Sequence, residues 1–362
     1  MKIGLLGTRG IPNRYGGFEE FAEQVSKYWG DSGHEVYVYC EDTPSKEVFE
    51  YSNVKQIFIS SSSLPFFSQF IYDYRSTKHA LRVELDIIYH AGYATSVLGN
   101  LLLKNKLGGR LVYNMDGLEW KRSKFNRITR WLTKKLEKAA AMSEAGLIAD
   151  NRGIQDYLKT EYGVQSTLIE YGANIIDSSI KKIEGYPEVF DLVIARFEPE
   201  NHIEEIIAAY EHVTDTTLVL VANKDTKLYH KLSARILKAQ NIIFNGPIYD
   251  KDELAYLKAK CRYYIHGHTV GGTNPSLLEA LAGGCIIMIN DNNFNRDVVG
   301  PHGYAWSNQS DLEKLINSNN QRLTTVQSQK QYCADRFNWK RIADDHICVF
   351  KIMIEKQQKE LL

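Results

Sequence analysis

The sequence predicts an α/β protein of two doubly wound domains, on the evidence of its length, its alternation of elements and the character of its apolar runs. At 362 residues the chain is longer than a single hydrophobic core usually organises. Short apolar runs alternate with longer patterns of period 3.6, which is typical of βαβ units. The short runs lack apolar–polar alternation. We therefore expect parallel strands that are covered by helices on both faces.

The expected strands fall into two series, and the pattern restarts near residue 190. A polar stretch, Asp177–Glu188, contains Gly185 and Pro187 and shows no clear period, so we interpret it as a linker. A long helical pattern runs from Trp339 to Leu362. The expected strands are Lys2–Gly7, Glu35–Cys40, Val54–Ser60, Asp86–His90, Arg110–Asn114, Gly146–Asp150 and Thr167–Tyr171, then Asp191–Arg196, Thr217–Ala222, Ile242–Asn245, Tyr263–Gly267 and Cys285–Asn290.

Charge, cysteines and hydropathy narrow the class of protein. The 44 basic and 44 acidic residues cancel, so the overall charge favours no particular partner. No CxxC pair occurs, and Cys40, Cys261 and Cys285 lie in or beside apolar stretches, as expected for buried thiols in a reducing compartment. The N-terminus lacks the features of a signal peptide, and no apolar run approaches the ~20 residues that span a bilayer. We expect a cytoplasmic protein that can rest on a membrane.

A glycine-rich loop, residues 7–20 (GTRGIPNRYGGFEE), follows the first expected strand. A helix is predicted to begin just after Gly16 and Gly17, and a helix N-terminus carries about half a positive charge. Arg9 and Arg14 add two formal charges. Together these features suit a diphosphate, although a tight turn could require the same glycines for its backbone. The spacing is not GxGxxG, so a nicotinamide cofactor is not indicated.

The second series of strands has its own candidate anion site. Arg196 stands where the first strand of this series ends, and the carboxyl ends of parallel strands are where open sheets bind ligands. It could pair with a phosphate or be an ordinary surface arginine. Further along, Asn274 is a suitable N-cap and Pro275 a suitable first helical residue, so the loop before them leads into a helix N-terminus.

Three polar side chains near this second loop have alternative interpretations. Glu279 lies one turn inside the expected helix, where its carboxylate could accept hydrogen bonds from two neighbouring sugar hydroxyls or could simply be solvated. His266 and His268 share one face of a strand and resemble a metal-binding pair. Since no third ligand is visible, we expect no metal.

The motifs resemble those of a known enzyme family. GTRGIPNRYGGFE resembles the N-terminal domain of bacterial rhamnosyltransferases of capsule and cell-wall polysaccharide synthesis, and VGGTNPSLLEALAGG resembles the C-terminal motif of retaining family 4 glycosyltransferases. The resemblance implies a GT-B fold of two facing Rossmann-like domains. The acceptor-side domain would be residues 1–180 plus a returning helix at 341–362, and the nucleotide-sugar domain would be residues 181–340.

The resemblance also implies residue roles. Gly16, Gly17 and Arg196 would hold the donor diphosphate, and Glu279 would bind ribose or deoxyribose hydroxyls. The implied reaction is retaining transfer of a sugar without a metal or cofactor, to a lipid-linked or polysaccharide acceptor. Rhamnose from dTDP-rhamnose is the expected donor. The residues expected to cover the donor sugar and phosphates are Gly271, Gly272, Thr273 and Asn274.

Three positions depart from the family pattern. Gly271 stands where the family has a glutamate, and Asn201 stands where it has a lysine. Loss of that glutamate is compatible with a deoxysugar, and the missing cation would come from Arg9, Arg14 or Lys224. Asp116 stands where many relatives have a histidine near the donor sugar, and we predict Asp116 and Arg196 as the catalytic residues. A nucleotide-sugar 2-epimerase and a degenerate donor-binding module without activity remain alternatives.

Residues 121–138 (KRSKFNRITRWLTKKLEK) are strongly basic and predict an amphipathic helix. Such a helix could lie on an anionic membrane, with Trp131 as an interfacial anchor, or its apolar stripe could pack on the sheet. No nucleic-acid motif accompanies it, so no nucleic-acid partner is expected. The aromatic segment Leu64–Tyr74 could border the acceptor site. The apolar stripe consists of Phe125, Ile128, Trp131, Leu132 and Leu136.

Overall fold

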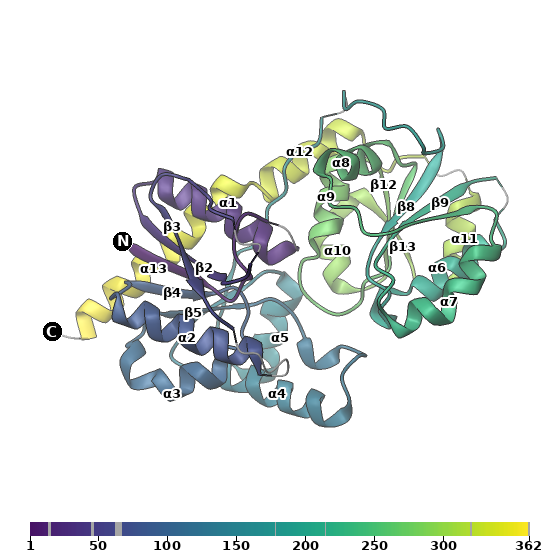
Figure 1. Cartoon of the computed structure of the whole chain (residues 1–362). Helices are drawn as coiled ribbons and strands as arrows, with labels where there is room; N and C mark the ends of the chain where they lie inside the picture. The colour runs from purple at the N-terminus through teal and green to yellow at the C-terminus, as the bar shows by residue number, and fades with distance from the viewer. Residues whose placement is uncertain are drawn as a thin grey trace. The chain divides into compact units, whose positions relative to one another are not determined.

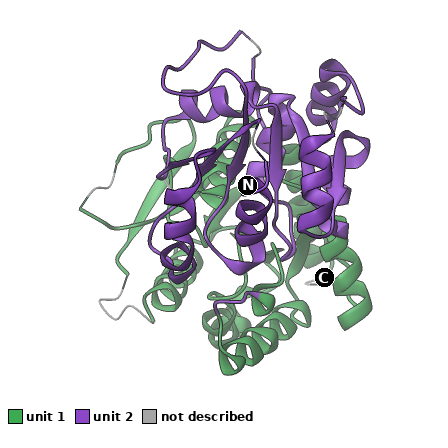
Figure 2. Ribbon diagram, turned by 90° about the vertical axis from the view of Figure 1, so that its right-hand side faces the viewer, with its two compact units in different colours: residues 1–121, 125–172, 339–362 green, residues 122–124, 173–338 purple. Residues whose placement is uncertain are grey.

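The computed structural model describes residues 1–13, 16–44, 47–61, 67–177, 179–213, 215–318 and 321–360. The chain forms two compact units, shown in different colours in Figure 2. Unit 1 comprises Met1–Lys121, Phe125–Gly172 and Trp339–Leu362, and unit 2 comprises Arg122–Lys124 and Ala173–Asn338. Each unit contains one parallel sheet with helices on its faces (Figure 1).

Unit 1 contains a seven-stranded sheet, within the described residues, in the order β3-β2-β1-β4-β5-β6-β7. All of its strand pairs are parallel, and Leu6 pairs with His90 at the carboxyl ends of β1 and β4. The strand order reverses between β1 and β4, so the switch point of the sheet lies there. The elements are β1 (Lys2–Leu6), α1 (Gly17–Asp31), β2 (Glu35–Glu41), β3 (Val54–Ile59), α2 (Ser68–Arg82), β4 (Ile87–His90), α3 (Val97–Leu107), β5 (Leu111–Met115), η1 (Glu119–Lys121), α4 (Arg127–Ala141), β6 (Gly146–Ala149), α5 (Arg152–Tyr162), β7 (Thr167–Leu168) and α13 (Trp339–Glu360).

Unit 2 repeats this plan: its described residues form a six-stranded sheet in the order β10-β9-β8-β11-β12-β13. Its strand pairs are also parallel, and its switch point lies between β8 and β11. The elements are β8 (Phe190–Ile194), η2 (Pro199–Asn201), α6 (Ile203–Tyr210), β9 (Thr217–Val221), α7 (Lys227–Lys238), β10 (Ile242–Asn245), α8 (Lys251–Lys260), β11 (Tyr263–His266), α9 (Pro275–Gly283), β12 (Ile286–Asn290), α10 (Asn293–Val299), η3 (Gly300–His302), β13 (Gly303–Trp306), α11 (Gln309–Asn317) and α12 (Val326–Arg336).

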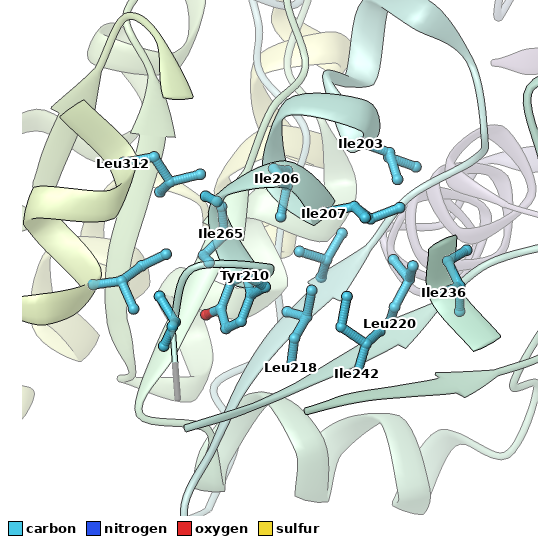
Figure 3. Packing of buried hydrophobic residues seen from close by; sticks show 14 of the residues in the cluster. Ile203, Ile206, Ile207, Tyr210, Leu218, Leu220, Ile236, Ile242, Ile265 and Leu312 are labelled. Atoms are coloured by element: carbon cyan, nitrogen blue, oxygen red, sulfur yellow. The ribbon is translucent and has the colours of Figure 1, made fainter. Parts of the chain in front are cut away.

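In the core of unit 2, the helical spacing of apolar residues on α6 matches the face of that helix that is buried. Ile203, Ile206 and Ile207 recur at helical spacing on α6 and are fully buried, together with Leu218 and Leu220 from one face of β9 (Figure 3). Each such side chain contributes about 1.5–3 kcal/mol by leaving water. The apolar period of α6 therefore fixes which of its faces meets the sheet.

The predicted fold class is confirmed by the two parallel sheets, and every predicted strand overlaps an observed one. The segment predicted at Thr167–Tyr171 pairs only over Thr167–Leu168, because Tyr171 turns inward and accepts a hydrogen bond from Asn114. Strand β13 was not predicted from the sequence. Its four residues, GYAW, directly follow Gly300, Pro301 and His302, which read as a turn.

The change from unit 1 to unit 2 lies at Gly172–Ala173 rather than at residues 180 and 181. The stretch interpreted as a linker belongs to unit 2, and its flanks are held there by specific contacts. Lys330 Nζ donates to the carbonyl of Ile176 at 2.6 Å, and the hydroxyl of Tyr186 donates to Glu253 at 2.5 Å. A polar composition therefore marked a surface segment, not a boundary.

Helix α13 completes the core of unit 1. The indole N–H of Trp29, on α1, donates to the carbonyl of Ala343 at 3.1 Å. His346 and Phe350 pack against the rings of Trp29 and Tyr89. Burial among these rings lowers the pKa of His346 to about 4. Residues from both extremes of the numbering thus share one core.

The basic segment 121–138 is not a single helix. Arg122–Lys124 belongs to unit 2, and α4 begins only at Arg127, where the side chain of Asn126 caps it. Lys134, one of the basic residues of this segment, turns inward between Glu137 and Glu161, with its ammonium 4.5 Å from the Trp120 ring centroid.

The apolar stripe of α4 is divided in the same way. Leu136 is buried, whereas Ile128 and Trp131 are 77% and 62% exposed, and Leu132 is also exposed. Packing on the sheet therefore accounts for only one end of the stripe. No helix in the described part of the chain is both long enough and apolar enough to cross a bilayer.

Candidate donor-binding site

The switch point of unit 2 brings together two loops, one after β8 and one after β11. The N–H of Thr269 donates to the carbonyl of Glu200 at 3.0 Å, and Asn201 Oδ1 lies 2.8 Å from His268 Nδ1. A Cβ at Gly267 would lie 2.1 Å from the carbonyl oxygen of Asn201, so only glycine permits this approach. The two loops therefore form one continuous surface at the carboxyl ends of β8 and β11.

Arg196 lies in the first of these loops with its side chain exposed. Its carbonyl accepts hydrogen bonds from the N–H of Glu198 at 2.7 Å and from Asn201 Nδ2 at 2.8 Å. The backbone is thus held while the guanidinium is free to meet a ligand. Asn201 is buried and connects both loops, so the residue that replaces the family lysine has a structural role.

The second loop ends at the N-terminus of α9. Asn274 Oδ1 accepts from the N–H and the hydroxyl of Ser276 at 3.0 and 2.8 Å, and the Tyr264 hydroxyl donates to Ser276 Oγ at 2.9 Å. The first turn contains no acidic residue. Gly271 and Gly272 have φ angles of 52° and 77°, in the left-handed region. The helix therefore presents N–H groups and a positive dipole end without a competing carboxylate.

Glu279 lies one turn further along α9 and is ion-paired with Lys258 of α8. The Lys258 side chain is 6% exposed, whereas that of Glu279 is 41% exposed. Glu279 also lies close enough to Tyr264 to add to burial in raising the pKa of that phenol. Lys258 was not predicted as a site residue, although the sequence contains a signal for it. Leu254, Leu257, Lys258 and Cys261 recur at helical spacing, which places the lysine on the buried face of α8.

The two histidines of β11 and its loop are not arranged as metal ligands. Their ring centroids are 6.2 Å apart, and His268 Nε2 lies 3.0 Å from the carbonyl of Val270. Burial lowers the pKa of His266 to about 3 and that of His268 to about 4, so both are neutral at pH 7. Within the described ranges no three His, Cys, Asp or Glu side chains converge as a metal site.

The glycine-rich loop of unit 1 is arranged differently. A Cβ at Gly10 would lie 2.6 Å from the Cβ and Sγ of Cys40, and φ there is +115°, so the fold itself requires glycine. At Gly16, by contrast, the nearest atom among the described residues would be Glu19 Oε2 at 3.9 Å, and φ is extended. Packing against the described residues therefore does not explain a glycine at this position, beside the N-terminus of α1.

Carboxylates of α1 already occupy N–H groups of that loop. Arg9 N donates to Glu19 at 2.9 Å, and Asn13 N donates to Glu23 at 2.7 Å. Burial raises the pKa of Glu19, against the effect of the Arg9 N–H. The side chain of Arg9 is exposed, and Arg14 lies outside the described residues.

Lys224 lies in the loop after β9, with its ammonium 5.4 Å from the ring centroid of Phe244 on β10. Strand β8, which leads to Arg196, borders the opposite side of β9. Asp116 follows β5 in unit 1 and is half-buried; a Cβ at Gly92, just beyond β4, would lie 3.6 Å from its Oδ1. Unit 2 thus gathers Arg196, Gly271–Asn274 and Glu279, while Arg9, Gly16, Gly17 and Asp116 belong to unit 1.

Comparison with protein families agrees with this division of the chain. Residues 178–330 match the family described as glycosyl transferases group 1. The chain therefore carries a group 1 glycosyltransferase domain. Residues 1–174 match DUF1972, a domain family of unknown function.

Whole-chain relatives point the same way. An uncharacterized glycosyltransferase, MJ1069 of Methanocaldococcus jannaschii, is 22% identical, covering 94% of this chain and 95% of its own length. The sucrose-phosphate synthase of Thermosynechococcus elongatus superposes with a TM-score of 0.78 at 17% identity, covering 98% of this chain and 99% of its own. WaaG, a glycosyltransferase involved in lipopolysaccharide biosynthesis, superposes with a TM-score of 0.70 at 14% identity, covering 97% and 99%. These likenesses establish the GT-B fold.

Proposed function

We propose that the protein transfers a sugar from a nucleoside diphosphate to an acceptor hydroxyl. The observation that carries this proposal is the N-terminus of α9, which lies at the switch point of unit 2, is capped by Asn274 and has no acidic residue in its first turn. Arg196 supplies a formal positive charge from the neighbouring loop, and Glu279 supplies an acceptor for hydroxyl groups one turn away. This combination suits a ligand with both phosphates and sugar hydroxyls.

In the proposed reaction these groups act on the departing diphosphate. The dipole of α9 and the Arg196 guanidinium stabilise the negative charge that develops as the glycosidic bond breaks. Asp116 accepts a hydrogen bond from a hydroxyl of the donor sugar. The acceptor proton passes to the leaving phosphate, the configuration is retained and no metal is required. Gly16, Gly17 and Arg9 contribute to the phosphates from unit 1.

Rhamnose from dTDP-rhamnose is the proposed donor. Gly271 offers no carboxylate to a donor hydroxyl, and a 6-deoxysugar presents fewer hydroxyls than glucose does. The product would be a capsule or other cell-surface polysaccharide, which requires a lipid-linked or polysaccharide acceptor.

We propose that the enzyme works in the cytoplasm on the inner face of the cell membrane. Helices α3 and α4 pack together, and both expose apolar side chains: Leu102 of α3 is 80% exposed, and Ile128 and Trp131 of α4 are 77% and 62% exposed. Helix α4 also carries the exposed cations Arg127, Lys135 and Lys138, and the ammonium of Lys135 lies 5.7 Å from the ring centroid of Trp131. Apolar side chains bordered by cations suit an anionic lipid surface.

Sedimentation with anionic vesicles tests this membrane proposal. The protein is expected to sediment at low salt and to be released at 1 M salt, where the Debye length is about 3 Å. Reversing Arg127, Lys135 and Lys138 to Glu should abolish sedimentation. Reversing the exposed Lys227, Lys238 and Lys314 of unit 2 is the matched control and should not. A wild type that ignores anionic vesicles at low salt would refute membrane binding by this face.

Turnover of nucleotide sugars, with and without acceptor, tests the proposed reaction. A glycosyltransferase consumes donor only with an acceptor, apart from slow hydrolysis, whereas a 2-epimerase converts the donor alone and a binding module converts nothing. Glu279→Ala should weaken nucleotide binding by about tenfold or more while the fold persists. Glu313→Ala on α11 is the control.

A further inference from the structure

Lys258 is a buried cation whose role the proposed reaction does not explain. Its side chain is 6% exposed, and its ammonium is paired with Oε2 of Glu279. Glu279 is the side chain proposed to bind the nucleoside sugar. Whatever Lys258 does to this carboxylate therefore changes what the nucleoside site can recognise.

The packing of α8 on α9 fixes where Lys258 reaches. A Cβ at Gly283 would lie 2.6 Å from the carbonyl oxygen of Lys258, so the backbones approach closely at that point. Cys261 Sγ donates to the same carbonyl at 3.7 Å. Glu279 is one helical turn before Gly283 on α9, and the lysine side chain spans that turn. The ion pair is therefore set by helix packing rather than by a mobile surface contact.

The ion pair leaves Glu279 with one unoccupied oxygen. In the described part of the chain, Oε1 of Glu279 accepts no hydrogen bond, and the side chain is 41% exposed. A carboxylate with both oxygens open can take the two neighbouring hydroxyls of a ribose, one on each oxygen. Here the ammonium already takes part of the acceptor capacity of Oε2, so Oε1 is the oxygen left fully open to a hydroxyl.

A ribose hydroxyl cannot easily displace Lys258. Within the described contacts Glu279 is the acceptor of its ammonium, and a buried ammonium that loses its only partner is strongly destabilised. We propose that Lys258 sets the nucleoside specificity of this site by blocking one oxygen of Glu279, so that the donor is held through a single sugar hydroxyl. This inference rests on the proposed function and deepens it, because the site then accepts 2′-deoxyribonucleoside diphosphate sugars as readily as their ribonucleoside counterparts.

Calorimetry with three nucleotides that differ by one hydroxyl at a time tests this inference. The probes are UDP, 2′-deoxy-UDP and 2′,3′-dideoxy-UDP, bound to the full chain. The expected order is equal affinity, within about threefold, for the first two, and a loss of about tenfold for the third, since one hydrogen bond to a charged acceptor is removed. A preference of tenfold or more for UDP over 2′-deoxy-UDP would overturn the inference.

Lys258→Met removes the charge and keeps a long side chain on the buried face of α8. Because Oε2 then becomes available, this variant should prefer UDP over 2′-deoxy-UDP by about tenfold. Lys260→Met, on the exposed face of the same helix, should keep the wild-type order. A Lys258→Met protein that folds and keeps equal affinities would show that Lys258 does not set the specificity, and the wild-type series decides the matter if the variant does not fold.

The two proposals fail in different ways. If neither these three nucleotides nor dTDP binds the wild type, the proposed function is wrong and the inference falls with it. If they bind, but ribose is strongly preferred, only the inference about Lys258 is wrong.

Discussion

The two glycine-rich loops of the molecule look alike in sequence but differ in what their own side chains do. The loop before α1 leads into a helix with Glu19 and Glu20 in its first turn and no side-chain cap. The loop before α9 leads into a helix capped by Asn274, with no acid in its first turn. Glycines and a helix N-terminus are therefore insufficient to define an anion site. Whether a carboxylate has already taken the N–H groups also matters.

The largest expected effect separates the glycines that serve the fold from those available to a ligand. Gly10→Ala should lower the free energy of unfolding by about 3 kcal/mol, because of its positive φ and the overlap with Cys40. Gly16→Ala should cost less than about 1 kcal/mol. Urea unfolding of both variants measures this difference. Equal losses would mean that Gly16 is also required by the fold.

Acidification is expected to change the stability that two buried groups contribute, His266 at the end of β11 and Glu19 on α1, in opposite directions. His266 has a pKa of about 3 when folded and about 6.5 when unfolded. Its contribution to stability is therefore complete above pH 6.5 and is lost as the pH falls, by about 2 kcal/mol at pH 5. Glu19 has a raised pKa, so its contribution is complete below its unfolded pKa of about 4.5 and is lost as the pH rises through the folded value.

Urea unfolding at pH 7 and pH 5 measures this contrast. His266→Gln should flatten the pH dependence by about 2 kcal/mol relative to wild type. His230→Gln, at an exposed histidine of α7, is the matched control. Glu19→Gln should gain stability relative to wild type at pH 7, and the gain should shrink on acidification. A pH profile of His266→Gln that follows the wild type would contradict this account.

Substitution of Arg196 and of Arg9 compares how much each loop contributes to binding the diphosphate. Arg196→Ala should weaken dTDP binding about tenfold, with little change for thymidine, because only the diphosphate meets the guanidinium. Arg9→Ala should weaken it less than about threefold, because Glu19 and Glu20 already oppose an anion at the α1 N-terminus. Calorimetric titration of both variants with both ligands is the measurement. A larger effect at Arg9 would reverse the ranking of the loops.

The smallest effect concerns the cap of α9. Asn274→Ala should lower the free energy of unfolding by about 1 kcal/mol. Asn274→Asp should preserve stability, because aspartate caps equally well, yet it should weaken dTDP binding by placing a negative charge at the anion site. Thermal melts and calorimetry on the two variants separate capping from anion binding. An aspartate variant with unchanged dTDP affinity would place the diphosphate elsewhere.

Much of the fold could be predicted because buried parallel strands leave an unambiguous apolar signature. In segments such as Thr217–Val221, that apolar signature is sufficient by itself to predict the strand. Strand β13 escaped because it is short and follows Gly300 and Pro301, whose local preference for a turn is overridden by pairing with β12. The segment before α4 was assigned to the helix because charge spacing cannot show that Asn126 caps it.

Site residues could be predicted from the sequence only where all the residues that define their position lie in one continuous segment. Asn274 and Glu279 lie on a single helix, and their placement on α9 follows from the sequence. Lys258 and Asn201 act through partners 21 and 67 residues away. Their roles depend on helix packing at Gly283 and on loop contact at Gly267, neither of which leaves a periodic pattern.

The place of α13 in unit 1 has a consequence for how the protein is made. The indole N–H of Trp29 donates to the carbonyl of Ala343, which is synthesised 314 residues later. A ribosome that adds about 5–20 residues per second needs about 10–30 s to produce Ala173–Asn338. During that interval α1 and β4 present an uncovered aromatic surface, and unit 2 can fold first. Chaperones that bind nascent chains must therefore protect the earliest residues for the longest time. A premature stop near the end of the chain would damage the unit that is translated first.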